Sequence, residues 1–300
     1  MVTSLVAEIA NSYYELMALD NQLEILRSNI VIQQDALEIV RLEKLAAKVT
    51  ELAVRRFEAE VLKNRSNLFD ILQRITETEN RINFLVGRYP QPVRRNSTGF
   101  SALVPDSISI GVPAQLLSYR PDIRRAELEL AAARLDVKAA QANFYPAVRL
   151  TAGAGLDAFD ASLLTETPAS LMYSVAGDLV APLINRNAIR ANYLGANARQ
   201  MQSVHGYEQT VLNAYVEVVN QLSDIRNLRA SYELRKQQVE ALSSSITISA
   251  NLFRSARADY MEVLLTQRDA LESKFELVET QKQRMNAMVS MYQALGGGWR

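Results

Sequence analysis

The sequence contains no cysteine, one histidine and one tryptophan, and its 33 basic residues balance 33 acidic ones. Without cysteine, the chain has no disulfide, no thiol nucleophile and no cysteine-ligated metal. The single histidine, His205, excludes a two-histidine metal site and leaves no pairing for a histidine-dependent catalytic triad. The balanced charge gives no electrostatic reason to expect nucleic acid as a partner. We therefore expect a protein that is not an enzyme and that uses no cofactor or metal.

Long hydrophobic runs are also missing from the sequence. It has no stretch of about 18 consecutive apolar residues, so it predicts no transmembrane helix. The first residues lack the basic segment and apolar core of a secretory signal peptide. An amphipathic helical pattern instead follows Met1 almost at once, and from this we expect that the chain is cut at its N-terminus.

A very long helix is predicted at residues 187–256, where proline is absent and no glycine follows Gly206. Apolar residues recur every seven positions along this segment. A seven-residue repeat under-winds a helix to about 3.5 residues per turn and is typical of a left-handed coiled coil. At about 1.5 Å per residue the helix would reach roughly 100 Å, which is too long for one compact core. The apolar residues seven positions apart are Val204, Val211, Val218, Ile225, Tyr232, Val239, Ile246 and Phe253.

Two helical hairpins of the sequence match each other. Residues 2–46 and 51–85 are predicted to be helices joined by a short turn, and Gly87 and Pro90 end the second helix. We interpret the match as a duplication in which residues 112–209 begin the second repeat, while about 100 residues that would begin the first are absent. The identical pairs, 209 positions apart, are Glu8/Glu217, Asn11/Asn220, Leu19/Leu228, Glu24/Glu233, Ala47/Ala256 and Gly87/Gly296.

The middle of the chain changes character twice. Proline and glycine concentrate at residues 88–112, which predicts irregular structure with one short strand at 107–110. Pro121 then begins a helix that is predicted to continue to Phe144.

After Pro146 the apolar period becomes two. Residues 148–156 alternate between apolar and polar or small side chains over about the length that a tilted strand needs to cross a bilayer. A second strand is predicted at 171–183, after a polar loop at 158–170. The alternative is a hairpin of a soluble protein, half-buried against the helices.

Four segments of the sequence are distinctive: LLSYRPDIRRAELELAAARLDVKAAQANFYPAV, APLINRNAIRANY, LFRSARADYMEVLLTQRDAL and ALGGGW. They resemble the outer membrane factor family, the TolC-like efflux proteins, and especially the branch that works with RND pumps. The resemblance implies a homotrimeric tube with a β-barrel in outer membrane lipid, a long α-helical barrel in the periplasm and an equatorial collar. The expected fold is mainly α with a β-hairpin, in two structural repeats of which the first is incomplete.

On this basis we expect six segments in the chain. They are a helical hairpin of the first repeat (1–87), an equatorial linker (88–116), a helix of the second repeat (117–145), a membrane β-hairpin (146–185), a long coiled-coil helical hairpin (186–295) and a C-terminal collar segment (296–300). Family members carry two strand hairpins per chain, whereas this sequence shows one. Unpaired strand edges in lipid cost several kcal/mol per backbone group, so we expect a fragment that does not conduct by itself.

The resemblance also implies two groups of functional residues. Glu262, with Asp259 as the next candidate, would line a gate at the periplasmic end. The simpler interpretation of Glu262 is a carboxylate at a helix start, worth about 0.3–1 kcal/mol there, and both can hold together. The residues that would contact a periplasmic adaptor protein and the RND inner membrane pump are the turn residues Ala47, Lys48, Val49, Thr50, Ala256, Arg257 and Ala258.

The expected function is therefore that of an outer membrane channel with a periplasmic helical portion. It would serve a tripartite efflux system as a passive duct that exports small molecules across the periplasm and the outer membrane. The alternative is a non-enzymatic soluble helical scaffold, or a nonfunctional truncated fragment.

Overall fold

The computed structural model describes residues 2–103, 120–165, 167–181, 185–255 and 257–297. The chain forms two compact units, one of residues 1–120 and 214–300 and the other of residues 121–213. The strand predicted at 107–110 lies outside the described residues.

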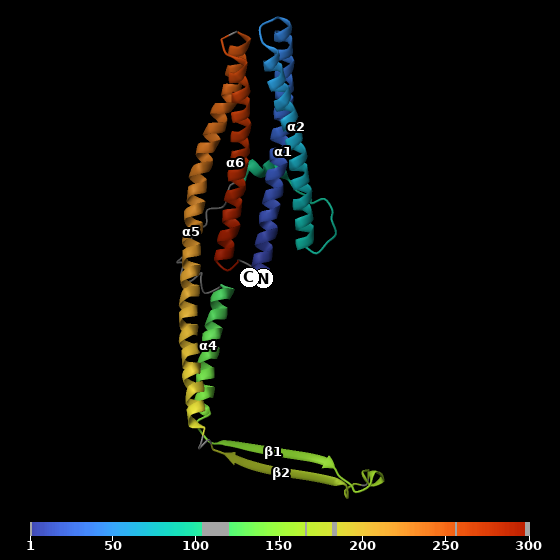
Figure 1. The fold of residues 1–300 in the computed structure, drawn as a ribbon, viewed down its shortest axis with the longest axis vertical. Coiled ribbons are helices and arrows are strands. Elements are labelled where there is room, and N and C mark those ends of the chain that lie inside the picture. Colours follow the sequence, from blue (N-terminus) through green and yellow to red (C-terminus); the bar gives the residue numbers. More distant parts are fainter. Residues whose placement is uncertain (1, 104–119, 166, 182–184, 256, 298–300) are drawn as a thin grey trace. The chain divides into compact units, whose positions relative to one another are not determined.

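Helices that run side by side form the first unit (Figure 1). α1 (Val2–Leu45) and α2 (Glu51–Leu85) make one antiparallel hairpin, and the C-terminal part of α5 (Arg186–Arg254) makes another with α6 (Tyr260–Ala294). α1 packs against both α2 and α6. α1, α2 and α5 begin and end within two residues of their predicted bounds, and α6 ends one residue before the predicted end of the second hairpin, because sustained apolar periodicity is a strong local signal.

The two hairpins repeat one backbone pattern, and each bound of α6 lies 209 positions after the matching bound of α2. Each helix also ends with the same hydrogen bond from an N–H group to the carbonyl five residues earlier, as in a Schellman motif. The duplication predicted from the sequence is thus confirmed for these hairpins. The equivalent pairs, all 2.9 Å from nitrogen to oxygen, are Lys48–Glu43 and Arg257–Leu252 at the turns, and Arg88–Asn83 and Gly297–Tyr292 at the opposite ends.

The apolar core of the first unit lies mainly between α1 and α2. Leu16, Leu19 and Leu26 of α1 are almost fully buried and pack in one cluster with Ile71 and Ile75 of α2. Full burial of one such side chain contributes about 1.5–3 kcal/mol relative to exposure. The helices of this hairpin therefore hold together through their own apolar stripe.

The second unit contains α4 (Pro121–Ala142), the strands β1 (Ala147–Leu156) and β2 (Leu171–Val180), and the first part of α5. The strands pair antiparallel, from Ala147 opposite Val180 to Leu156 opposite Leu171, and a short 3₁₀ helix (Ala161–Leu163) lies in their connection.

One helix and one strand of this unit end earlier in the structure than the sequence predicted. α4 stops two residues before Phe144, because Pro146 disfavours helical geometry in the residue before it. β2 stops at Val180 rather than at residue 183, and residues 182–184 lie outside the described part of the chain.

Candidate functional site

One face of the β-hairpin is apolar, and the other carries polar and small side chains together with Met172 and Val180 near its two ends. Arg149 and Asp178 are the charged residues of the two strands, and they oppose each other on the second face, where Thr151 and Ser174 also lie. The apolar face consists of Val148, Leu150, Ala152, Ala154 and Leu156 of β1 with Leu171, Tyr173, Val175, Gly177 and Leu179 of β2.

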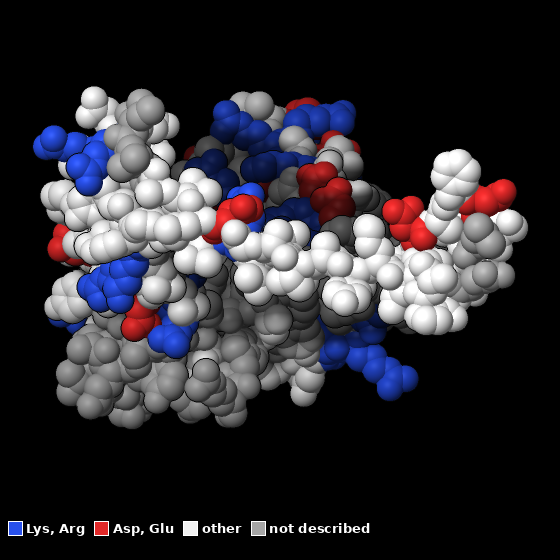
Figure 2. Space-filling view, turned by 90° about the horizontal axis from the view of Figure 1, so that it is seen from below, with Lys and Arg blue, Asp and Glu red and all other residues white. Residues whose placement is uncertain are grey.

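Every residue of both strands is exposed, so no described part of the chain covers either face. Figure 2 shows the hairpin surface as largely free of charged side chains. A two-stranded hairpin is marginally stable at best in water. Ten residues at about 3.4 Å each, tilted by about 45°, rise roughly 24 Å, close to the apolar band of about 25 Å on outer membrane proteins. The dimensions and the exposed apolar face both suit insertion into lipid.

A segment at residues 93–103, here called the strap, crosses the first unit and contains a 3₁₀ helix, η1 (Ser97–Ala102). Arg95 forms a bidentate pair with Asp20 of α1, with distances of 2.5 Å from Nε and 2.9 Å from Nη2. Arg95 also pairs with Glu79 of α2, and Ser97 Oγ donates to Asp20 at 2.5 Å. The strap is thereby tied to both helices of the first hairpin.

The strap is tied to the second hairpin through Gln281 of α6. The Gln281 amide donates to the carbonyl oxygens of Phe100 at 3.2 Å and Leu103 at 2.7 Å. The Phe100 ring is fully buried against Met17 of α1 and Val278 of α6. One short segment therefore holds α1, α2 and α6 together.

The contacts of the strap stabilise the ionised forms of Asp20 and Arg95. Burial raises the pKa of the Asp20 carboxyl, but hydrogen bonds from Arg95 and Ser97 outweigh burial and hold this pKa below its usual value. The hydrogen bond to Asp20 in turn raises the pKa of Arg95. Both groups stay ionised at neutral pH.

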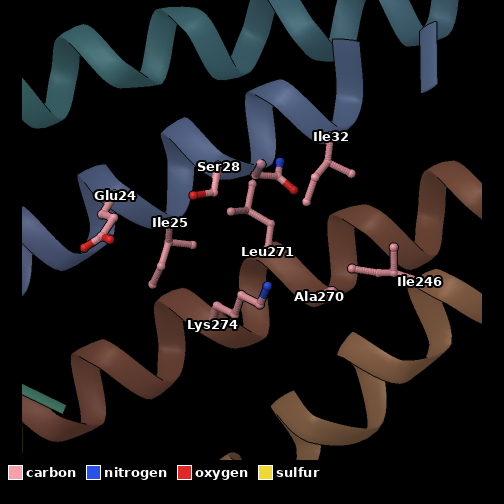
Figure 3. Close-up of a pocket in the computed structure, with 9 residues that line it drawn as sticks. Glu24, Ile25, Ser28, Ile32, Ile246, Ala270, Leu271 and Lys274 are labelled. Carbon is pink, nitrogen blue, oxygen red and sulfur yellow. The ribbon is translucent and has the colours of Figure 1, made fainter. Parts of the chain in front are cut away.

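The packing between the two hairpins leaves a pocket between α1 and α6. This pocket of about 260 Å³ is lined by residues of both helices. Figure 3 shows Ile246 of α5 at one end of it. Glu24 and Lys274 line it without an ion pair between them, and Asn29 Nδ2 finds no hydrogen-bond partner within the described residues. A cavity and an unsatisfied donor both weaken an interface.

The turns that join the two helices of each hairpin have matching backbones but differ in the ion pairs that their charged side chains form. In the first turn, Glu51 pairs with Lys44 and, at 2.8 Å, with Arg55, which also pairs with Glu58 at 3.0 Å. The predicted contact residues Ala47, Lys48, Val49 and Thr50 form this turn, and Ala47 has a left-handed φ of 58°.

In the second turn, Arg257 and Asp259 are exposed and join no ion pair among the described residues. Ala258 lies between them, and Ala256 lies outside the described residues. Asp259 is the N-cap residue of α6, and the exposed Glu262 lies in the first turn of that helix. The predicted gate residues lie next to the predicted contact residues of the second turn because they follow them directly in the sequence.

Within the described residues, no group of three or more His, Asp or Glu side chains could hold a metal ion. His205 lies on the surface of α5, with Nδ1 3.1 Å from Glu208 Oε2. The helices in the part of the chain that the structure describes are too polar or too short to span a membrane.

The strap contacts were missed by the sequence reasoning, which described residues 88–116 only as a linker. Arg95 and Asp20 are 75 positions apart, and no period or motif connects them. Their one local signal is charge, since Asp20 directly follows the apolar run of residues 16–19 in α1.

Comparisons with known proteins agree with this geometry. The sequence model of one family, described as outer membrane efflux protein, matches residues 112–297. The pyoverdine export outer membrane protein OpmQ of Pseudomonas aeruginosa is 30% identical over 297 residues, which cover 99% of this chain and 62% of that protein. The cation efflux system protein CusC of Escherichia coli is 28% identical over 296 residues, covering 99% of this chain and 64% of CusC.

Solved structures share the fold. The outer-membrane channel OprN superposes with a TM-score of 0.87 at 27% identity, covering 99% of this chain and 67% of the OprN chain. A crystal structure of CusC, described with its folding and transmembrane channel formation, also has a TM-score of 0.87, at 28% identity, covering 99% of this chain and 69% of that one. The chain therefore spans about two thirds of the length of these relatives.

Proposed function

Because the chain belongs to the outer membrane efflux protein family, we propose that it is part of a passive duct that exports small molecules across the periplasm and the outer membrane. The relatives compared above are channels and export proteins of the outer membrane rather than enzymes, and this chain shares that location, with its helical portion in the periplasm. The observation that carries the proposal is the two-faced hairpin, whose apolar side is wholly exposed. In a homotrimer, its apolar face would contact lipid and its polar face would line the duct.

The duct would work in a tripartite system with a periplasmic adaptor protein and an RND inner membrane pump. The turns of the helical hairpins are the sites proposed to contact the adaptor. The second turn supports this role, because its charged side chains Arg257 and Asp259 are left for a partner, whereas Glu51 of the first turn is paired within the chain.

The absence of native cysteine makes the hairpin proposal directly testable by single-cysteine labelling. Val175→Cys and Ser174→Cys place neighbouring thiols on opposite faces of β2. In outer membranes, we expect the thiol at position 174 to react with a water-soluble maleimide and the thiol at 175 to react only with a lipid-soluble one. Equal reaction of both thiols with the water-soluble reagent would support a soluble scaffold instead.

The adaptor contact is tested by cross-linking in cells that make the adaptor. Ser255→Cys, beside the second turn, should cross-link to the adaptor, whereas Ser66→Cys, an exposed position on α2, should not. Arg257→Glu should reduce the cross-link at position 255. Equal yields at positions 255 and 66 would remove the turn as the contact site while leaving the channel proposal intact.

A further inference from the structure

The end of the β-hairpin where the helices join it carries exposed aromatic and basic side chains. Tyr145 lies two residues before β1, and 66% of its surface is exposed. Phe144 and Tyr193 of α5 meet edge to face, with ring centroids 6.0 Å apart and ring planes at 78°. Amphipathic aromatic rings are typical of the zone where a membrane meets water.

Two arginines lie on the same end of the second unit. Arg186 and Arg190 are exposed in the first turns of α5 and make no ion pair or hydrogen bond with the described residues. They are four positions apart, so their Cα atoms differ in height along the helix by about 6 Å. The headgroup region of one leaflet is about 5–8 Å thick, so both guanidinium groups fit within it.

Arg186, Arg190 and Tyr193 lie on one face of α5, because they are four and three positions apart. Tyr193 also contacts Phe144, which together with Tyr145 precedes the hairpin. We propose that Arg186 and Arg190, together with Phe144, Tyr145 and Tyr193, form a docking surface for anionic phospholipid headgroups of the periplasmic leaflet. The proposal rests on the membrane hairpin of the proposed function. Guanidinium groups bind phosphate oxygens in pairs of parallel hydrogen bonds, and the aromatic rings pack at headgroup level.

This surface would select among lipid headgroups, which the apolar face of the hairpin alone would not do. The apolar face would suit any acyl chain, because burial of apolar area does not distinguish headgroups. Two unpaired guanidinium groups, in contrast, favour a lipid with net negative charge, at about 1 kcal/mol or about fivefold for each cation near the surface. The bound lipid should therefore be an anionic phospholipid rather than a zwitterionic one.

The test uses tryptophan fluorescence of the full chain with Trp299→Phe as background, since Trp299 is the single native tryptophan. Tyr145→Trp reports on the docking surface, and Val175→Trp reports on the middle of the apolar face. In bilayers, lipids brominated near the headgroup should quench Trp at 145 best, and lipids brominated near the chain end should quench Trp at 175 best. Quenching of neither tryptophan overturns the membrane hairpin and this proposal with it.

The headgroup preference is tested in mixed bilayers in which either phosphatidylglycerol or phosphatidylcholine carries the bromine. We expect a several-fold preference for phosphatidylglycerol around Trp at position 145, and Arg186→Gln with Arg190→Gln should abolish it. Arg134→Gln with Lys138→Gln removes the same charge from exposed positions of α4 and should keep the preference. Equal quenching by the two lipids, or equal loss in both double variants, overturns the docking surface even where Trp at 175 is inserted. Helix content by circular dichroism confirms that each variant is folded.

Discussion

Ala47 is the one non-glycine residue with a positive φ in the part of the chain that the structure describes. It ends α1 in the left-handed region, with φ of 58°, where Gly87 and Gly296 occupy the equivalent positions after α2 and α6. A side chain costs about 1–2 kcal/mol in that conformation, and glycine avoids the cost. The hydrogen bonds from Ala47 N to Lys44 O and from Lys48 N to Glu43 O, both 2.9 Å, hold the residue there.

Ala47→Gly should therefore raise the free energy of unfolding of the first hairpin by about 1 kcal/mol. The measurement is urea unfolding followed by helical circular dichroism. The control is Ala46→Gly, one residue earlier, where φ is not positive and where glycine should lower stability by about 0.5–1 kcal/mol. The same sign at both positions would contradict the argument.

The Asp20 carboxyl predicts how stability depends on pH. Its pKa is lower in the folded chain than in the unfolded one, where about 3.9 is usual. Its contribution is thus fully present above the unfolded pKa and is lost as pH falls through the folded pKa. The free energy of unfolding should decline below about pH 4, and the decline should be smaller in Asp20→Asn. Parallel pH profiles of the two proteins between neutral and acid pH would exclude this role.

Among the elements, the strap determines how the helices of the first unit are joined. Arg95→Met keeps the apolar stem but leaves the Asp20 and Glu79 carboxylates without their common cation. We expect a loss of about 2–4 kcal/mol, because removing one partner strands partly buried charges. Arg41→Met removes an exposed ion pair to Glu38 and should cost less than about 1 kcal/mol. Similar losses in both variants by urea unfolding would show that the strap adds nothing.

Two buried asparagines allow the contact within the first hairpin and the contact between the hairpins to be tested separately. Asn64 of α2 donates to Gln33 of α1 at 2.8 Å, whereas Asn29 Nδ2 lacks a partner among the described residues. Asn64→Leu should therefore destabilise the fold by about 1–3 kcal/mol, and Asn29→Leu should be neutral or stabilising by about 1 kcal/mol. Thermal unfolding tests this difference, and a loss of stability in Asn29→Leu as large as that in Asn64→Leu would contradict it.

For the whole molecule, the remaining prediction concerns the gate. In a trimer, three-fold symmetry would bring three copies of Glu262 together, and a ring of carboxylates attracts cations. In a conducting trimer in which this chain is extended to the length of its relatives, Glu262→Gln should lower the preference for cations over anions in single-channel recordings at low salt. Glu272→Gln makes the same charge change at another exposed position of α6 and should leave selectivity unchanged. If Glu262→Gln has no effect in a stable trimer, Glu262 acts only at the start of its helix and Asp259 is the next candidate.

The sequence by itself determined the elements and their repetition. A heptad stripe, a period of two and a match at a fixed offset are local patterns, and each follows from the geometry of one helix or strand. They predicted the bounds of α1, α2 and α5 and the end of α6 within two residues, and they predicted the two faces of the hairpin. The gate and turn residues came from the family resemblance, and their roles stay predictions.

Only the tertiary structure decided which distant residues meet. The pairing of Arg95 with Asp20 and of Gln281 with the strap carbonyls joins positions that no sequence period connects. The same holds for the unsatisfied Asn29 between α1 and α6. The physical reason is that a polar contact depends on where two side chains end in space, whereas periodicity reports only which face of its own element a residue occupies.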